Sequence, residues 1–97
     1  MYQVNNTIQS QSFNKLQVEK IAKNDNLEVL SISLEKDFIF PEHTSSRDAL
    51  LILLEGDINF NINEENYRLK KHQELSFPKH EKHWVKANEN SKFLIIR

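Results

Sequence analysis

The 97-residue sequence contains no cysteine, a single glycine and two prolines. Without cysteine, the chain forms no disulfide and has no thiolate that could ligate a metal or attack a substrate. No charge sign dominates either, because 13 basic side chains oppose 14 acidic ones for a formal net charge of -1. Such a chain lacks the basic field that recruits nucleic acid or an anionic membrane, so we expect neither partner.

Long apolar segments are also missing. The longest unbroken apolar run covers residues 49–54, which is far too short to span a bilayer. Residues 1–7 are polar and lack the apolar region of a signal peptide, which predicts a cytoplasmic protein. The length predicts one domain over residues 1–97. Within it, residues 1–15 are expected to be flexible or to act as an exchanged edge strand.

Short stretches of alternating apolar and polar residues dominate the rest of the chain. Residues 30–34 alternate leucine or isoleucine with serine, and residues 58–62 alternate isoleucine or phenylalanine with asparagine. A period of two is typical of a half-buried strand. Further strands are predicted at residues 38–40, 49–54, 67–69, 75–77, 84–87 and 93–96. Strands this short, separated by turn residues, predict an all-β sandwich or barrel. Only residues 13–22 could be drawn as a helix.

Because glycine is scarce, other residues must occupy the turn positions that need a positive φ. The chain contains eleven asparagines, many of them between the predicted strands. Asparagine tolerates the left-handed region and bonds its own backbone, so we expect it to fill these turn positions, with a hairpin loop at residues 63–66. The single glycine, Gly56, is expected to adopt a backbone angle closed to bulky residues.

Residues 49–54 are apolar at every position. A strand that is apolar on both faces must be covered on both. One face can line the interior, and the other then needs a partner, as do residues 93–96. A second copy of the chain is the expected partner, so the sequence predicts a homodimer.

Two proline-bearing segments each bring a histidine to the start of a strand. Pro41-x-His43, followed by an apolar strand that ends in Leu-Glu-Gly-Asp, resembles the first conserved motif of the cupins. Pro78 followed by His83 resembles their second motif, and the stretch between the motifs is similar in length and alternation. The resemblance covers about residues 27–97. It implies a small antiparallel jelly-roll β-barrel, commonly dimeric, with the motif histidines pointing into the barrel mouth.

The resemblance also shows where this sequence departs from the family. Metal-binding cupins usually present His-x-His, then a glutamate, then the histidine of the second motif. His43 and His83 match the first and last of these ligands, whereas Ser45 stands in place of the second histidine. Ala49 stands at or next to the position where the family has the glutamate, and Asp48 lies one residue earlier. His72 and His80 occupy positions where the family's second motif usually or often has glycine.

The ligand set is therefore incomplete at the level of sequence. A catalytic metal generally needs three protein ligands and an open position. Glu42, Asp48 or His80 could supply a third, but strand alternation places Asp48 on the face opposite Ala49.

Two functional interpretations remain open. The leading one is a stand-alone cupin domain that binds a small molecule in the barrel mouth, without catalysis. Its ligand-binding residues are predicted to be His43, Ser45, Phe77, His83 and Trp84. The alternative is a metal-dependent cupin enzyme of the isomerase or dioxygenase type, in which His43 and His83 hold a weakly bound zinc, nickel or manganese ion. General acid–base chemistry by either imidazole is also open, because imidazole titrates near neutral pH.

Overall fold

The alternating segments form nine strands, which follow one helical turn in a computed structural model that describes residues 1–97. The elements are α1 (Thr7–Ser10), β1 (Leu16–Lys23), β2 (Glu28–Leu34), β3 (Ile39–His43), β4 (Ala49–Glu55), β5 (Asp57–Ile62), β6 (Glu65–Lys70), β7 (Glu74–Phe77), β8 (His83–Ala87) and β9 (Ser91–Ile96). The structure contains no helix with the length and apolar character needed to cross a membrane.

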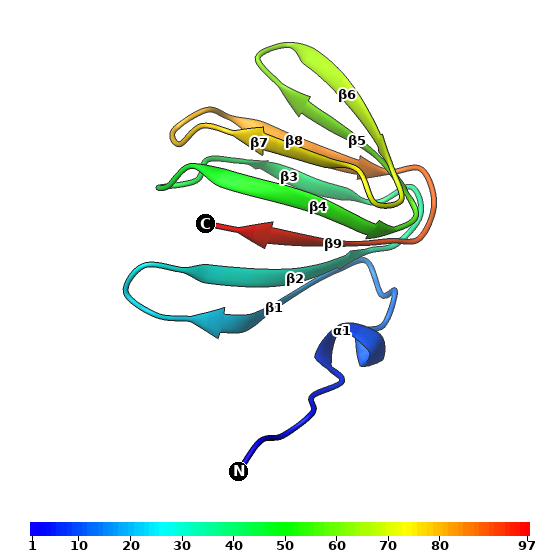
Figure 1. The fold of residues 1–97 in the computed structure, drawn as a ribbon. Helices are drawn as coiled ribbons and strands as arrows, with labels where there is room; N and C mark the ends of the chain where they lie inside the picture. The colour runs from blue at the N-terminus through cyan, green and yellow to red at the C-terminus, as the bar shows by residue number, and fades with distance from the viewer.

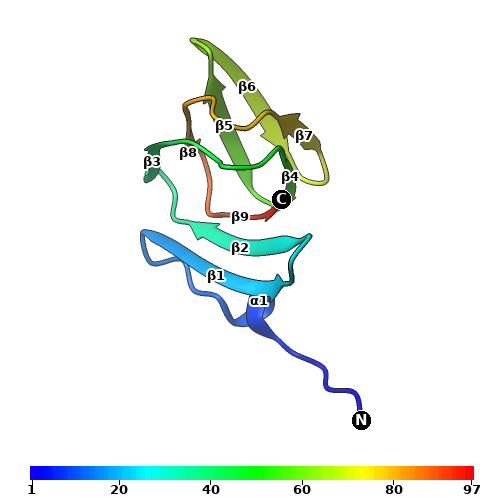
Figure 2. The same ribbon diagram turned by 90° about the vertical axis from the view of Figure 1, so that its left-hand side faces the viewer.

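The strands make two antiparallel sheets that enclose the core, as Figures 1 and 2 show from two sides. One sheet has five strands in the order β1-β2-β9-β4-β7, and the other has four in the order β3-β8-β5-β6. Several neighbours in a sheet are distant in sequence, such as β4 with β9 and β5 with β8. The fold is all-β, as the strand pattern predicted, and is the antiparallel jelly roll that the resemblance to the cupins implied.

The core lies between the two sheets and follows directly from the alternation. Inward-facing positions of both sheets contribute its fourteen buried residues. Phe60 on β5 and Phe93 on β9 are the largest fully buried side chains. Burying one such apolar side chain is worth about 1.5–3 kcal/mol, so the alternating pattern fixes which face of each strand points inward.

Strand β1 was not among the predicted strands, and residues 13–22, the one segment that could be drawn as a helix, form no helix. Most of β1 is exposed, and only Leu16 and Gln17 are half-buried, so the strand carries little apolar signal. A bulge between Lys20 and Ala22 further breaks its alternation. Pairing with β2 along its whole length, rather than intrinsic propensity, makes this segment a strand.

Residues 7–13, here called the N-terminal strap, pack on the outer face of the five-stranded sheet. The side-chain amide of Gln11 donates to the Ser31 backbone carbonyl at 2.9 Å, and the Ser31 hydroxyl donates back to Gln11 Oε1 at 2.7 Å. The buried Lys92 ammonium donates to the Ile8 carbonyl at 2.8 Å. Polar contacts therefore hold the strap, while residues 1–6 extend away from both sheets (Figures 1 and 2).

The turns use fewer asparagines in the left-handed region than expected. Asn63 and Glu64 both have positive φ and form the two-residue turn between β5 and β6, a geometry that matches the twist of a hairpin. The other non-glycine residues with positive φ are Lys15, Asp37, His72 and His80. Several of the other asparagines form hydrogen bonds through their side chains instead. Asn24 Oδ1, for example, accepts a hydrogen bond from the Asn26 backbone N–H at 2.8 Å.

Gly56 occupies the tight turn between β4 and β5 with φ of +95°. A Cβ at this position would lie 2.5 Å from the Asn90 carbonyl oxygen and 2.7 Å from Ser91 Cα. It would also meet the Ser91 hydroxyl, which accepts the Asp57 amide at 3.1 Å. Both the backbone angle and the space around it therefore require glycine, as predicted.

Candidate functional site

His43 and His83 lie directly opposite each other although forty positions separate them in sequence. His43 ends β3, His83 begins β8, and the two are cross-strand partners. Their ring centroids are 4.2 Å apart, with the rings inclined at 64°. The prediction that these two imidazoles meet is confirmed.

A β-bulge in β3 sets the direction of His43. Phe40 pairs with Val85 and His43 with His83, so two residues of β3 stand opposite Trp84 alone. One of the two is Pro41, which has no N–H to contribute to a ladder and is tolerated at such an irregularity. The extra residue brings Phe40 and His43 to the same side of the strand. Their rings stack with centroids 4.4 Å apart.

Both imidazoles are held by backbone carbonyls in the same way. His43 Nδ1 lies 2.7 Å from the Pro41 carbonyl, and His83 Nδ1 lies 3.0 Å from the Glu81 carbonyl. A carbonyl oxygen only accepts, so each Nδ1 carries the proton and donates it. The Nε2 atom of each neutral ring is then a free acceptor, and neither has a hydrogen-bond partner in the protein.

His83 is far more enclosed than a residue at a barrel mouth need be. It is 3% exposed, and the rings of Phe77 and Phe60 have centroids 4.6 and 5.5 Å from its own. This burial is the main reason that the pKa of His83 lies below its ordinary value, and repulsion from Arg97, and from His43 when that ring is protonated, lowers the pKa further. The Glu81 carbonyl acts in the opposite direction. Together, these effects favour the neutral imidazole.

The two histidines line a cavity of about 270 Å³ between the sheets. Its walls come from β1, β2, β3, β7, β8 and β9, from the segment that precedes β4 and from the residue that follows β9. The lining residues are Val18, Leu30, Ile32, Phe40, His43, Thr44, Ser45, Phe77, His83, Ile95 and Arg97. The walls are mostly apolar, with polar groups from the two imidazoles, two hydroxyls and one guanidinium, and they include no carboxylate.

The structure brings four of the five predicted ligand-binding residues together. Ser45 and Phe77 are buried and line the same cavity as the two histidines. Trp84 does not, and its expected place in this pocket is wrong. It follows His83 in β8 and therefore points to the opposite face of the sheet. There it lines a depression on the outer face, here called the outer depression, with Glu42 and the β5–β6 hairpin.

Sequence reasoning missed Arg97 and Phe40 as cavity residues. Phe40 was read only as part of a strand, and its inward direction depends on the bulge. Arg97 follows β9, and its position beside the cavity depends on β2. Its Nε donates to Glu28 Oε1 at 3.0 Å, and Glu28 begins that neighbouring strand. No local pattern in the sequence signals this long-range contact.

The residues present do not fit the metal centre that metal-binding cupins carry. No group of three or more histidine, aspartate or glutamate side chains is placed to hold an ion. The Ser45 hydroxyl donates to the Arg47 carbonyl at 2.7 Å, and Asp48 is exposed with Oδ1 accepting the Lys79 amide at 3.0 Å. Neither residue completes a ligand set with the two imidazoles.

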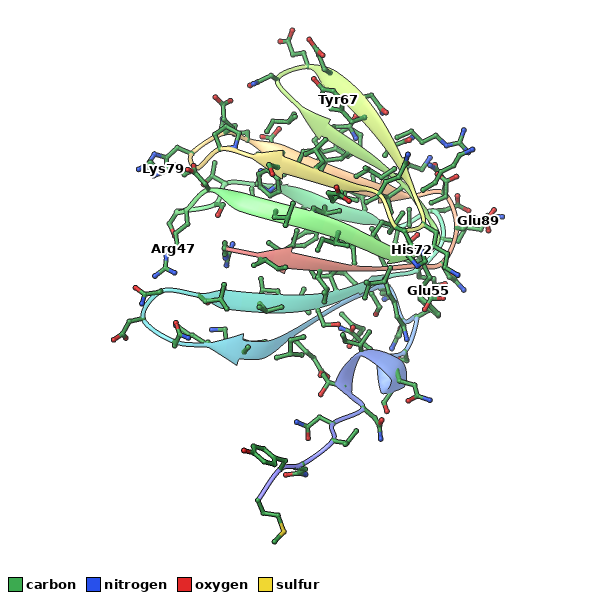
Figure 3. All side chains as sticks on the ribbon, viewed as in Figure 1. Arg47, Glu55, Tyr67, His72, Lys79 and Glu89 are labelled. Carbon is green, nitrogen blue, oxygen red and sulfur yellow. The ribbon has the colours of Figure 1, made fainter.

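His72 and His80 lie apart from the cavity. Figure 3 shows His72 at the end of the sheets opposite Arg47 and Lys79, whose loops adjoin the cavity. The His80 side chain lines the outer depression. Both residues have positive φ, of 71° and 68°, at the positions where the cupin motif usually or often has glycine. Two residues other than glycine thus adopt the left-handed conformation that glycine accommodates most readily.

Comparison with solved structures identifies the fold. The chain is similar to an RmlC-like cupin protein from Desulfovibrio desulfuricans, with a TM-score of 0.86 and 18% identity over 99% of this chain and 95% of that one. A cupin-2 domain protein from Shewanella frigidimarina matches with a TM-score of 0.79 and 23% identity, over 97% and 92% of the two chains. KdgF from a Halomonas species matches with 0.79 and 19%, over 89% and 81%.

No protein-family model matches the sequence. No curated protein matches it either. The solved structures nevertheless leave no doubt about the architecture, and the chain has the fold of the small cupins.

Proposed function

We propose that this cupin domain binds a small molecule in the cavity beside His43 and His83 and does so without catalysis. The observation that carries the proposal is the pair of free Nε2 acceptors at the wall of a partly open, mostly apolar cavity. Pockets for drug-sized ligands hold about 300–1,000 Å³, so a cavity of about 270 Å³ suits a smaller molecule.

The hydrogen bonds of the imidazoles support binding rather than acid–base chemistry. A catalytic histidine is commonly oriented by a carboxylate, which stabilises the imidazolium that forms during the reaction. Here each Nδ1 donates to a neutral backbone carbonyl instead. No carboxylate lines the cavity to share a proton with either ring.

The alternative is a metal-dependent enzyme. One observation favours it, which is that both Nε2 lone pairs are available on rings only 4.2 Å apart. Two protein ligands hold a divalent ion weakly, so any zinc, nickel or manganese should leave during dialysis against a chelator.

The two functions are separated by metal content and by ligand screening of tag-free protein. We expect less than stoichiometric metal after chelation. We also expect members of a fragment library to shift the side-chain NMR signals of His43 and His83. His43→Ala should abolish the shift of the remaining His83 signal, and His72→Ala, at a distant exposed histidine, is the matched control. Stoichiometric metal that survives chelation and is lost from His43→Ala would establish the enzyme alternative instead.

A further inference from the structure

We infer that the ligand of this cavity is a small hydroxy acid, with a carboxylate next to Arg97 and a hydroxyl group that donates to the imidazoles. The inference rests on the proposed function and specifies the class of molecule. Three features of the cavity carry it: the charge beside it, the hydrogen-bonding direction of its imidazoles and the apolar remainder of its walls.

The charge around the cavity favours an anion. Arg97 is the only residue among the eleven lining ones with a permanent charge, and none of the eleven is acidic. Its partner Glu28 does not line the cavity and is shared with two further cations. Lys20 and Lys23 Nζ lie 3.5 and 3.9 Å from Glu28 Oε2, while Arg97 Nη2 lies 2.9 Å from Oε1. Glu28 is thus shared among three cations rather than paired with Arg97 alone, and Arg97 is the cation that lines the cavity.

Arg97 also retains a free donor. Its Nε and Nη2 atoms both contact Glu28, whereas Nη1 has no hydrogen-bond partner in the protein. A guanidinium donates through a planar fork and pairs well with carboxylates. A ligand carboxylate would therefore add to the Arg97–Glu28 pair rather than replace it.

The imidazoles require a donor from the ligand. Both Nδ1 protons are already given to backbone carbonyls, so a neutral ring offers only the Nε2 lone pair to the cavity. A carboxylate has no proton to donate and would repel such a lone pair. An ammonium group could donate, but the positive charge of Arg97 opposes it. A hydroxyl group satisfies His43 or His83 without adding charge.

The rest of the wall limits the size and polarity of the ligand. Six of the eleven lining residues are hydrophobic, and the aromatic ring of Phe40 extends the stack of His43. A short aliphatic body would fill this space and remove apolar surface from water. A short carbon chain with a carboxylate and a hydroxyl therefore offers one group to the guanidinium, one to the imidazoles and one to the apolar wall.

The test uses matched probes that differ by one group. These are 2-hydroxybutyrate, butyrate and butane-1,2-diol, with the corresponding six-carbon compounds as a second set. Binding is followed by calorimetry and by the NMR signals of His43 and His83. We expect at least one hydroxy acid to bind at least about tenfold more tightly than the acid and the diol of its own set.

Two variants test the role of the charge. Arg97→Gln should lower the affinity for the hydroxy acid at least about tenfold while leaving that for the diol unchanged. Glu28→Gln is the matched control, because it removes the partner of Arg97 but keeps the guanidinium. It should preserve or increase hydroxy-acid affinity. An equal loss in both variants would show that the ion pair is only structural and would overturn the role of Arg97.

The remaining outcomes test the class of ligand and the proposed binding function separately. If a diol or a neutral fragment binds beside the histidines as tightly as any hydroxy acid, the ligand class is wrong and the proposed binding function stands. If no probe and no fragment shifts the signals of His43 and His83, both are wrong.

Discussion

Replacing Gly56 with alanine should destabilise the domain more than the addition of one methyl group at almost any other position. At φ of +95°, a residue with a Cβ is strained by about 1–3 kcal/mol. The added methyl also meets the Asn90 carbonyl oxygen at 2.5 Å and Ser91 Cα at 2.7 Å. Forcing an extra carbon into packed surroundings costs about 1–3 kcal/mol more. Relief of this clash would displace the Ser91 hydroxyl, which accepts the Asp57 amide.

The combined cost of roughly 2–6 kcal/mol is a large share of the roughly 5–15 kcal/mol that stabilises a typical native protein. For a domain of this length each kcal/mol lowers the melting temperature by about 4–8 °C, so Gly56→Ala should lower it by at least about 8 °C. Thermal and urea unfolding, followed by circular dichroism, measure the change. An unaltered urea slope would place the effect in the folded state.

His72→Gly provides the matched control. His72 also has positive φ, at 71°, but it is exposed and already carries a side chain. Its replacement should change the free energy of unfolding by less than about 1 kcal/mol, because relief of strain offsets the added freedom of the unfolded chain. A Gly56→Ala protein that melts within about 2 °C of the original would refute the argument from backbone angle and crowding.

Two further predictions concern pH and assembly. The pKa of His83 is lowered by folding, so the unfolded chain takes up this proton first, and stability should fall as pH drops below about 6.5, by at most about 1.4 kcal/mol per pH unit. Urea unfolding at several pH values between 7.5 and 5 measures this, and an unchanged slope in His83→Gln would contradict it. We also propose that two copies associate through the outer face of β4 and β9, where Leu50 pairs with Ile96 and Ile52 with Leu94, all of them half-exposed. Ile52→Lys should yield a monomer in sedimentation equilibrium, and a single-chain mass for the unaltered protein at micromolar concentration would contradict the proposal.

The sequence predicts best the strands in which alternation and burial agree. In residues 58–62 every second side chain enters the core, so the pattern alone specifies both the strand and its inner face. In β1 the pattern fails, since pairing with β2 creates a strand that buries almost no apolar surface. The packing of the N-terminal strap could not be predicted either, because the side chains of Gln11 and Lys92 are polar and their burial depends on distant partners.

In the candidate site, too, some residues could be placed from the sequence and others could not. His43 and His83 could be placed together because their motifs belong to a known pattern, whereas Arg97 reaches the cavity only through a contact with Glu28 that spans most of the chain. Trp84 was misplaced although its neighbour His83 was placed correctly. One position along a strand reverses the direction of a side chain, so proximity in a motif does not imply a shared pocket.

The bulge in β3 makes the cavity sensitive to the length of the chain. Phe40 and His43 face the same side only because one additional residue lies between them. Deleting that residue would turn the His43 imidazole to the outer face of the sheet. The strands beyond it would keep their pairing and their core. A protein lineage built on this barrel could therefore lose or regain the site through the deletion or insertion of one codon, with little change in the stability of the fold.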